Sequence, residues 1–585
     1  MTDADALATA LPLLQPGDEH TTAEWEAAAA AVLRKARRLS ETDADALAWD
    51  KLARTTLDGI AVTPLGMPGG HLDRQSIVSV RPTRQGAWDI RSLIADPEAK
   101  LANEAALVDL DGGVTSLWLA ADESTDVAAT LAGVLLDLAP VVLDAPTAPA
   151  TIADAFLALP GAKHPDCNLG IDPLGAMLRR PTVEQSPLAM EELTGYARKA
   201  WQADIRAIVV DATAAHDLGA SDAQELGWAI AVGTAYLRAL AGDGFGPDEA
   251  ASLIEFRLAA TDEQFPTIAK FRALRTLWAS VLTHSGVADT TARVHGATSR
   301  PMLSKYDPYV NMLRGTVAAF AAGVGGADAV TVLPFDSANG RPDAFGRRIA
   351  RNVSHLLIDE SHVAAVADPA GGAYAVEQLT DDLAGKGWRE FQTLEAEWAG
   401  GADFAAFRGR VAEVVARREA EIAKRKRPVT GLSEFPNLAE TLPRRDADPL
   451  SDRVRRYGAS FEELRDQPAE QHLFLATLGT VAQHTARATF ITNLFAAGGI
   501  GVDSAGATAG VDDLVKAYAG QRVVCLAGSD AAYDEWGAAA AAALREAGAQ
   551  HVIIAGRPVD YADAAAAMGV DALAFLVSTR KELGK

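Results

Sequence analysis

The chain has 585 residues, more than one hydrophobic core supports, and this length predicts two or three domains. It carries 78 acidic against 54 basic residues, and a net charge of −24 excludes nucleic acid and anionic membranes as expected partners. No apolar run reaches the ~20 residues that cross a bilayer, and the first residues are acidic, so we expect a cytoplasmic protein. The two cysteines, Cys167 and Cys525, fall in different predicted domains, which indicates free thiols in a reducing compartment.

The first predicted element is an amphipathic helix over 21–38. Thr21 and Glu24 have the spacing of a capping box at its start. The apolar residues expected on one side are Trp25, Ala28, Val32 and Leu33. Because the helix precedes any core, other structure must cover this side. We expect residues 1–45 to form a helical arm that contacts a partner chain, with docking on the body of its own chain as the alternative.

A barrel is predicted next. From about residue 85 to 375, short apolar runs alternate with helical patterns, as in βα units on a parallel sheet. Seven candidate strands, most of them apolar on both faces, lie at 116–120, 141–143, 168–171, 207–210, 254–258, 329–333 and 363–366. An eighth, less regular candidate lies near 88–90. Eight such strands close a (β/α)₈ TIM barrel, which we prefer to an open sheet.

The rest of the chain predicts a second domain. A helical region over about 379–426 extends the barrel domain, which we place at 46–435, and prolines with charged residues mark a linker over 436–469. The second domain is predicted at 470–585. Its candidate strands alternate with alanine-rich helices and lie at 472–477, 522–527, 551–554 and about 573–577. This order indicates a flavodoxin-like, doubly wound sheet.

Several predicted barrel strands end in aspartate, at the rim where barrel enzymes place their active sites. These residues are Asp122, Asp144, Asp172, Asp211 and Asp368. A metal-binding or acid–base role is one interpretation. Aspartate between a strand and a helix is also a common cap and turn residue, and we favour that second interpretation.

The histidines of the predicted barrel domain show no spacing typical of a metal site. They include His216, His284, His295, His355 and His362. No other cluster of this kind is evident in the sequence. We therefore expect no metal ligand on this chain.

Five segments resemble the methylmalonyl-CoA mutase family, in matching order over roughly residues 50–585. They are TLDGI at 56–60, WDIR at 88–91, DPYVNMLR at 307–314, RIARN at 348–352 and DPAGGAY at 368–374. The resemblance implies an N-terminal barrel and a C-terminal cobalamin-type domain. It also implies the reaction of the family, which interconverts (2R)-methylmalonyl-CoA and succinyl-CoA with adenosylcobalamin.

The sequence departs from the family at the cobalt ligand. Family members carry D-x-H-x-x-G after the first strand of the cobalamin-type domain, and direct alignment places Gln483 at the histidine position. His484 is adjacent, with Ala482 two places before it and Arg487 three places after it. Even as a ligand, His484 would lack the carboxylate that orients a metal-binding histidine.

Two further departures concern the substrate. In the catalytic chain of the family, a segment shaped like SGYHMQEAGA places a histidine on the thioester carbonyl, whereas Ala214 takes this position here and His216 lies two residues later. The segment DLPTxxGYDSD of that chain is replaced by residues 120–126. We therefore expect no catalytic and no cofactor-binding residue on this chain.

The resemblance and its departures together imply the non-catalytic small (beta) subunit of the heterodimeric bacterial enzyme. Its expected partner is the large (alpha) subunit, which would bind adenosylcobalamin and substrate. Two alternatives stay open. One is an independently active acyl-CoA mutase with altered specificity, and the other is a non-enzymatic cofactor-loading or regulatory module.

Overall fold

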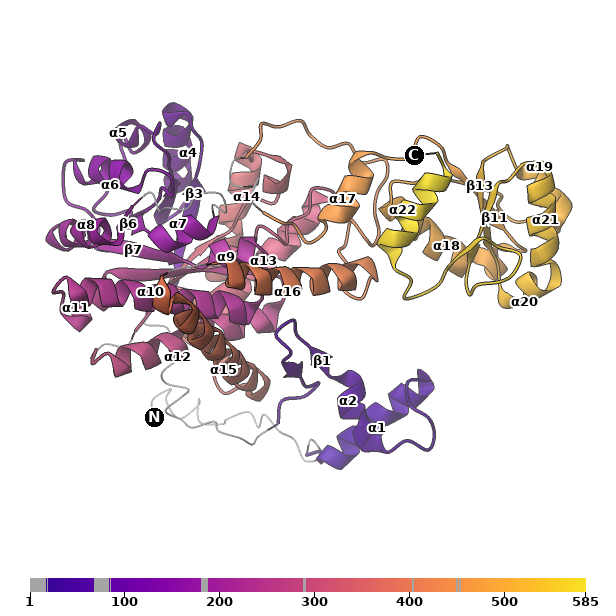
Figure 1. The fold of residues 1–585 in the computed structure, drawn as a ribbon, viewed down its shortest axis with the longest axis horizontal. Coiled ribbons are helices and arrows are strands. Elements are labelled where there is room, and N and C mark those ends of the chain that lie inside the picture. Colours follow the sequence, from indigo (N-terminus) through magenta and orange to yellow (C-terminus); the bar gives the residue numbers. More distant parts are fainter. Residues whose placement is uncertain are drawn as a thin grey trace, which may run out of the picture.

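The chain forms a barrel, a second parallel sheet and a helical arm (Figure 1). These features come from a computed structural model that describes residues 17, 19–67, 84, 86–179, 188–287, 291–401, 404–448, 451 and 454–584. The acidic first residues lie outside this set. None of the helices in the described ranges has the length and apolar character that a membrane crossing requires.

Eight parallel strands close the barrel, in the order β10-β3-β4-β5-β6-β7-β8-β9. Their bounds are Asp89–Ile94 (β3), Ser116–Ala120 (β4), Val141–Asp144 (β5), Asn168–Ile171 (β6), Arg206–Asp211 (β7), Ile254–Ala260 (β8), Arg293–Thr298 (β9) and Ala329–Thr331 (β10). β10 pairs with β3 only through Ala329 with Asp89 and Val330 with Ile90. The predicted (β/α)₈ barrel is confirmed, including its irregular first strand.

One predicted barrel strand is wrong. The segment predicted at 363–366 contains a 3₁₀ helix, η5 (Val363–Ala365), and the strand that closes the barrel is β9. The apolar pattern missed β9 because it carries Arg293, His295 and Gly296 among its apolar residues. Inside a barrel such polar side chains are stable when partners on other strands bind them.

Helices surround the barrel. Their bounds are Ala99–Asp111 (α4), Val127–Thr130 (α5), Pro149–Leu157 (α6), Pro173–Arg179 (α7), Met190–Gln202 (α8), Thr213–Asp217 (α9), Asp222–Gly242 (α10), Pro247–Ser252 (α11), Gln264–His284 (α12), Pro308–Val324 (α13) and Ala344–His355 (α14), with short turns η3 (Ser337–Asn339) and η4 (Leu356–Glu360). The helical region predicted over 379–426 is two helices, α15 (Tyr374–Glu397) and α16 (Ala405–Ala423), with η6 (Trp398–Gly400) between them. α15 packs closely on α10 because Gly227 faces Glu390, where a Cβ would lie 2.5 Å from the glutamate Cβ.

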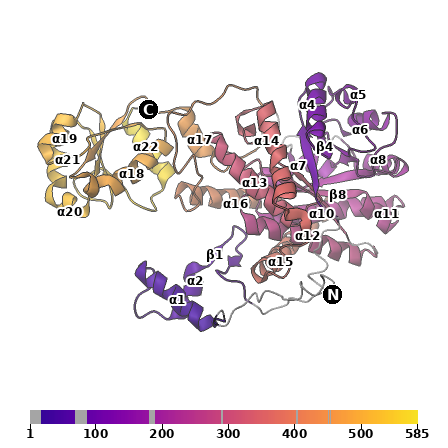
Figure 2. The ribbon, with the colours of Figure 1, turned by 180° about the vertical axis from the view of Figure 1, so that it is seen from behind.

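The second sheet has the strand order β12-β11-β13-β14-β15, all parallel, and this confirms the flavodoxin-like prediction. The strands are β11 (Leu473–Thr477), β12 (Val502–Ser504), β13 (Val523–Ala527), β14 (His551–Ala555) and β15 (Ala564–Ala566). Alternate residues face opposite layers: Leu475 packs with α18 (Val481–Ala497) and α22 (Ala572–Glu582), and Phe474 packs with α19 (Val511–Ala517) and α21 (Ala538–Glu546). Figures 1 and 2 show these two helical layers from opposite sides.

Two predictions in this sheet need correction. The segment at 573–577 is not a strand but part of α22, whose N-cap Asp571 accepts from the backbone N–H of Ala574 at 2.9 Å. A short apolar run does not distinguish a buried strand from a buried helix. The helix predicted at 531–547 consists of α20 (Asp530–Ala532), a π-helical turn η7 (Tyr533–Gly537) and α21.

The segment predicted as a linker is structured. It contains α17 (Ala459–Asp466). Lys305 of the barrel domain donates to Asp466 at 2.7 Å, and Arg580 of α22 donates to the carbonyl of Leu464 at 2.8 Å. α17 therefore connects the barrel side to the second sheet.

The predicted arm, residues 1–45, contains α1 (Thr22–Lys35) and the start of η2 (Asp45–Leu47). Next along the chain are α2 (Ala48–Leu52) and a small hairpin of β1 (Arg54–Thr55) and β2 (Ala61–Val62). The predicted capping box is confirmed, because Thr21 N–H donates to Glu24 Oε2 at 2.7 Å and Glu24 N–H donates to Thr21 Oγ1 at 3.3 Å. Leu33 packs in a small cluster with α2, whereas Val32 is 68% exposed and does not belong to the buried side.

Candidate functional site

Arginine–carboxylate pairs close the C-terminal rim of the barrel. Arg257 of β8 donates through Nη1 to Asp211 Oδ2 at 2.7 Å and lies 3.4 Å from Asp144 Oδ2. Arg179, at the end of α7, pairs with Asp144 at 3.4 Å and also with Asp211. The Arg257 guanidinium lies 3.9 Å from the centre of the Trp118 ring, which adds a cation–π contact. The strand ends thus hold this guanidinium inside the lumen.

The electrostatics of the rim favour fixed ion pairs over acid–base chemistry. Burial opposes ionisation of Asp211, but Arg179 and Arg257 outweigh burial and hold the pKa of Asp211 far below its usual range. Burial raises the pKa of Asp172 to about 6. The Asp172 carboxyl already accepts from the Tyr236 hydroxyl at 2.6 Å and from the backbone N–H of Gly175 at 3.1 Å. Its oxygens are therefore engaged by the protein itself.

The interpretation of the five strand-end aspartates as caps and turns is partly confirmed. Asp122 accepts from the backbone N–H of Ser124, and Asp172 from that of Gly175, as turn and cap residues do. Asp211 is a turn residue as well as an ion-pair partner, because its carboxylate accepts from Thr213 N–H at 3.0 Å and also binds Arg257. The interpretation is wrong for Asp144, whose carboxylate binds Arg179 and Arg257. Asp368 is a turn residue, because its carbonyl accepts from Gly371 N–H at 3.1 Å, and its carboxylate also pairs with Arg272.

His295 of β9 lies at the centre of the barrel. Arg257 Nε–H donates to His295 Nδ1 at 3.0 Å, and His295 Nε2 lies 2.8 Å from Thr331 Oγ1. Burial together with the charges of Arg91 and Arg257 holds the pKa of His295 well below its usual value. The imidazole is therefore neutral and accepts a hydrogen bond from the arginine.

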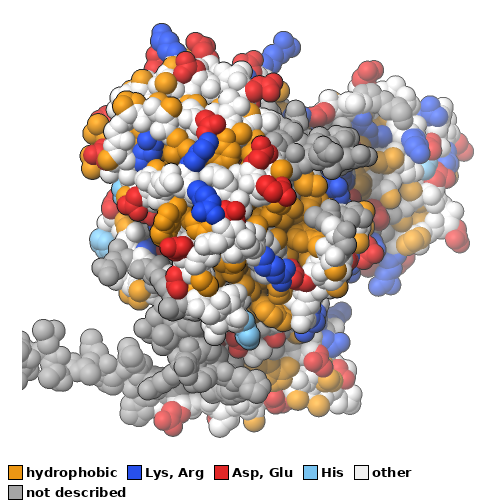
Figure 3. Space-filling view, turned by 60° about the vertical axis from the view of Figure 1, so that its left-hand side comes forward, with side chains coloured by type: hydrophobic (Ala, Val, Ile, Leu, Met, Phe, Trp, Pro, Cys, Tyr) orange, Lys and Arg blue, Asp and Glu red, His pale blue; other side chains and the backbone are white. Residues whose placement is uncertain are grey.

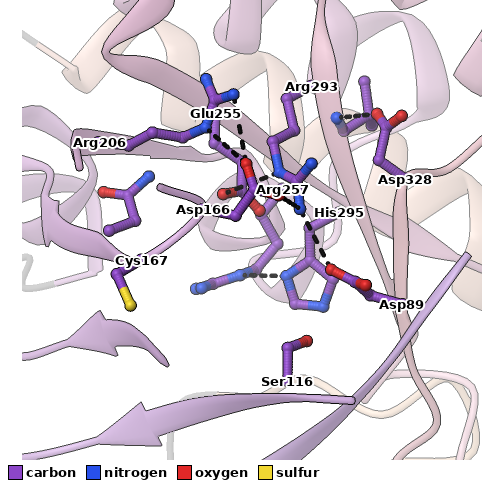
Figure 4. A network of polar contacts seen from close by, with 12 residues as sticks. Asp89, Ser116, Asp166, Cys167, Arg206, Glu255, Arg257, Arg293, His295 and Asp328 are labelled. Carbon is purple, nitrogen blue, oxygen red and sulfur yellow. Dashed lines mark hydrogen bonds and ion pairs between the residues drawn. The ribbon is translucent and has the colours of Figure 1, made fainter. Parts of the chain in front are cut away.

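A second ion-pair network closes the N-terminal mouth of the barrel (Figure 4). Glu255 of β8 accepts from Arg91 at 2.6 Å and lies 3.9 Å from Arg293. Arg293 also pairs with Asp89 at 3.1 Å and with Asp166 at 3.2 Å. Burial opposes ionisation of Glu255, but Arg91 and Arg293 outweigh it and lower the pKa of Glu255 to about 2.

Charged side chains therefore occupy the barrel from mouth to rim. The residues along this path are at most 2% exposed: Arg91, Glu255, His295, Arg257 and Asp211. A barrel interior is normally a packed core of apolar layers. Here the interior also holds two bound groups of polar side chains, Arg91 with Glu255 at one end and the neutral His295 with Arg257 and Asp211 toward the other.

A small cavity lies beside the lumen, where β3 and β10 diverge above their two paired residues. Its volume is about 100 Å³. The walls come from β3, from the residues after β10, from α14 and from the segment around Ser451. Sites for small-molecule ligands usually measure roughly 300–1,000 Å³, so this cavity is small for an enzyme's substrate.

The residues singled out near the end of β7 lie on α9. Ala214 is buried, and His216 Nε2 lies 2.7 Å from Ser299 Oγ, while its Nδ1 lies 3.5 Å from Glu225. Glu225 also accepts from Lys270 at 2.7 Å. His216 thus takes part in a buried bridge between α9, α10 and the residue after β9.

The other predicted histidines are dispersed. His355 pairs with Asp359 on its own helix at 3.0 Å, His284 contacts the carbonyl of Ser280 at 2.7 Å, and His362 lies in a loop with φ of 52°. In the described part of the chain, no three histidine, cysteine or acidic side chains come together in a way that could hold a metal ion.

The turn after β11 lies at the edge where doubly wound sheets bind ligands, between β11 and β13. Gln483 turns back to the start of α18, where its Oε1 accepts from Thr480 N–H at 2.8 Å and from Thr480 Oγ1 at 3.0 Å. The neighbouring His484 is buried, and its Nδ1 lies 3.3 Å from the carbonyl oxygen of Gly479. Both side chains serve the local structure of the turn.

Arg487 spans the crevice between the two strand ends. It donates to the carbonyl of Gly528 at 2.7 Å and pairs with Asp530 in the loop after β13. Its guanidinium also lies 4.8 Å from the centre of the Tyr533 ring. This side chain occupies the approach to the turn from the β13 side.

A larger cleft, of about 900 Å³, lies along the second half of α18. The sheet contributes Leu475 and Ser504, the loop after β15 contributes Met568, and the end of the barrel extension contributes Lys424 and Phe435. The cleft is separate from the turn, because Gln483, His484 and Arg487 do not line it.

Comparison with known proteins identifies the family. The model of the methylmalonyl-CoA mutase family matches residues 166–520. The chain is 42% identical to a methylmalonyl-CoA mutase small subunit from Streptomyces virginiae, over 96% of this chain and 97% of the relative. It is 40% identical to a probable methylmalonyl-CoA mutase small subunit from Mycobacterium tuberculosis, over 94% of each chain. It is 34% identical to the small subunit from Propionibacterium freudenreichii subsp. shermanii, over 99% of this chain and 97% of the relative. The chain belongs to the methylmalonyl-CoA mutase family.

Methylmalonyl-CoA mutases are isomerases and generally depend on cobalamin, which raises the question whether the residues of this turn fit that group. They do not fit a cobalt ligand. The Gln483 side chain is held in the helix cap, and Arg487 lies in the neighbouring crevice. His484 contacts the carbonyl of Gly479, and among the described residues it has no carboxylate partner. No step of a reaction is therefore assigned to cobalamin on this chain.

The sequence analysis of this mutase-family chain missed the arginines of the lumen. Arg91, Arg257 and Arg293 each lie on a barrel strand, and two of them belong to strands that were predicted, at least in part. A charged residue within an otherwise apolar strand is the signal that could have found them, because such a residue needs a buried partner of opposite charge.

Proposed function

We propose that this chain is the non-catalytic small subunit of an adenosylcobalamin-dependent methylmalonyl-CoA mutase in the cytoplasm. In this proposal the large subunit binds the cofactor and interconverts (2R)-methylmalonyl-CoA and succinyl-CoA, while this chain supports it in a heterodimer. We propose four parts for the chain: an arm (1–45), a barrel with its extension (46–435), a linker (436–469) and a degenerate cobalamin-type domain (470–585). We assign no catalytic, cofactor-binding or metal-binding residue to any of them.

The filled lumen is the observation that carries this proposal. A barrel mutase has to accommodate an acyl-CoA ester within the barrel. Here Arg257 lies between Trp118 and Asp211 in the lumen, and the ion pair of Arg91 with Glu255 closes the other end. Opening this path would leave buried charges without partners, at a cost of about 3–5 kcal/mol for each broken pair.

Exposed apolar side chains support the proposal that this chain binds a partner chain. Four aliphatic side chains of α4 and the segment after α5 are 45–68% exposed: Leu101, Val108, Leu135 and Leu138. Figure 3 shows hydrophobic side chains gathered between acidic and basic ones on one face of the molecule. Such surface is typical of chains that bury it against another protein. The arm, with its exposed Val32, offers a second apolar surface.

The test is to measure mutase activity and corrinoid absorbance for this chain alone, for the large subunit alone and for their mixture. We expect full activity only when the large subunit is present, and all corrinoid bound to that subunit. Turnover of methylmalonyl-CoA by the isolated small chain would contradict the proposal and favour an independent mutase.

The cleft along α18 supports one alternative, a cofactor-loading module. Its volume of about 900 Å³ is within the range of ligand sites. This alternative predicts corrinoid bound to the isolated chain without turnover, and release of that corrinoid to the large subunit on mixing. The small-subunit proposal predicts no bound corrinoid in the same experiment.

A further inference from the structure

Three cationic side chains without partners meet at one cavity on the outside of the barrel domain. They are Lys386 and Arg389 of α15 and Arg417 of α16. In the described part of the chain, none of the three forms an ion pair or a side-chain hydrogen bond. This is unusual for a chain with a net charge of −24, in which acidic groups outnumber basic ones. The three uncompensated cations call for a functional explanation.

The cavity is a structural concavity and not a flat surface. Its volume is about 310 Å³. One wall is α15, where Lys386, Arg389 and Thr393 follow one another at helical spacing and so share a face. The opposite side is the turn at 57–59 and the start of α10. The Lys386 ammonium lies over this turn, 3.8 Å from the position that a Cβ on Gly59 would take.

The two acidic residues of the cavity are already engaged. Glu390 accepts from Arg410 at 2.8 Å, and Arg410 also binds Glu397. Asp58 accepts from the backbone N–H of Ala223 at 3.4 Å, within the first turn of α10. Burial, followed by the charge of Asp222, raises the pKa of Asp58 to about 6, so this carboxyl is ionised at neutral pH and loses its charge in mildly acidic solution. Among the described residues, neither acid forms an ion pair with any of the three cations.

We propose that this cavity binds a small polyphosphate anion, of the kind carried by a nucleoside diphosphate, through Lys386, Arg389 and Arg417. Arginine and lysine are the residues that bind phosphate oxygens, and three of them match an anion with two phosphates better than a single carboxylate. The Thr393 hydroxyl lies on the same face but already donates to the backbone carbonyl of Arg389 at 2.9 Å, so the three cations carry the proposed contacts. The volume of about 310 Å³ is at the lower limit of ligand sites and fits a small anion of this kind.

The first experiment titrates the full chain with inorganic pyrophosphate and with ADP, followed by calorimetry and by the phosphorus NMR line of the ligand. We expect both probes to bind, with an affinity that falls as salt is raised, because the contacts are ionic. Tighter binding of ADP would indicate a nucleotide, and equal binding would indicate that the diphosphate alone is recognised. Absence of heat and of line broadening for both probes at millimolar concentration would overturn the proposal.

Variants locate the site. Lys386→Ala and Arg389→Ala are each expected to weaken pyrophosphate binding about tenfold, since a hydrogen bond to a charged group is lost. The matched control is Lys516→Ala, an exposed lysine of α19 far from the cavity in sequence and fold, which should leave the affinity unchanged. An equal loss in the control would assign binding to general charge and overturn the site.

A gain of affinity separates the proposal from damage to the fold. Asp58→Asn removes the only acid of the cavity that lacks an arginine partner and keeps an acceptor for Ala223 N–H. We expect pyrophosphate to bind several-fold more tightly to this variant, because a like charge is removed. A damaged fold cannot produce that increase, and unchanged or weaker binding by a folded Asp58→Asn chain would contradict the proposal. None of these measurements depends on mutase activity.

Discussion

The barrel lumen and the basic cavity use the same residue types in opposite ways. In the lumen, Arg257 and Arg91 are buried and each faces a carboxylate. In the cavity, Arg389 and Arg417 are exposed, and neither forms an ion pair with a carboxylate of the described residues. A buried charge is stable only with a partner, whereas an exposed charge is stabilised by water and stays available to a ligand. The charges inside this barrel therefore stabilise its structure, whereas those of the outer cavity stay accessible to solvent.

The largest effect is expected from breaking a lumen pair. Arg257→Ala leaves Asp211 and Asp144 buried with less compensation and should lower the free energy of unfolding by about 3–5 kcal/mol, as measured by urea denaturation. The control is Arg238→Ala, which breaks the exposed pair with Glu395 and should cost at most about 1 kcal/mol. Equal losses for the two variants would show that the lumen network contributes no more than surface pairs do.

The next largest effect is expected in the pH dependence of the free energy of unfolding, through Glu255 in the lumen. The pKa of Glu255 falls from 4.5 to about 2 in the folded chain, so its stabilisation is complete above about pH 4.5 and is lost as pH falls toward 2. This contribution is roughly 3 kcal/mol at neutral pH. Unfolding of the wild type should therefore depend on pH in this window. In Glu255→Gln this dependence should be reduced, and an unchanged pH profile would contradict the assigned ion pair.

The smallest effect is expected at the cavity, with the opposite sign. The folded pKa of Asp58 is raised from 3.8 to about 6, so its charge destabilises the fold above pH 6, and this penalty fades as pH falls toward 3.8. Asp58→Asn removes this penalty and should raise the free energy of unfolding by on the order of 1 kcal/mol at neutral pH. The gain is smaller than the pKa shift alone implies, because an amide interacts less favourably than a carboxylate with the start of α10. The gain should shrink near pH 4.5. A loss of stability at neutral pH would show that the carboxylate is needed in its charged form.

Much of the fold could be predicted because local chemistry and the hydrophobic pattern acted together. Apolar runs covered on both faces identified six regular strands of the barrel, and Thr21 with Glu24 identified the start of α1. Prediction failed where that pattern is ambiguous or interrupted: 573–577 is an apolar run that forms a helix, and β9 is a strand that carries Arg293 and His295.

The candidate site shows the same division. The departures at Gln483 and Ala214 are predictions that the sequence allows, because they concern residue identity at aligned positions. The partners of Asp144 and Asp211 could not be predicted in this way, since Arg257 lies 113 and 46 positions away from them. The turn after β11 was located correctly, but the reach of Arg487 to Gly528 depends on the neighbouring strand order.

The sequence by itself determined the elements of this protein and their order, since helix caps, strand periodicity and turn residues act over a few positions. It also determined the family, through segments whose order is preserved. Only the tertiary structure decided which charges meet. Barrel closure brings Arg91 to Glu255 across 164 positions, and the packing of α15 and α16 brings Lys386, Arg389 and Arg417 to one cavity. Electrostatic partners are set by distance in space, and distance along the chain does not encode it.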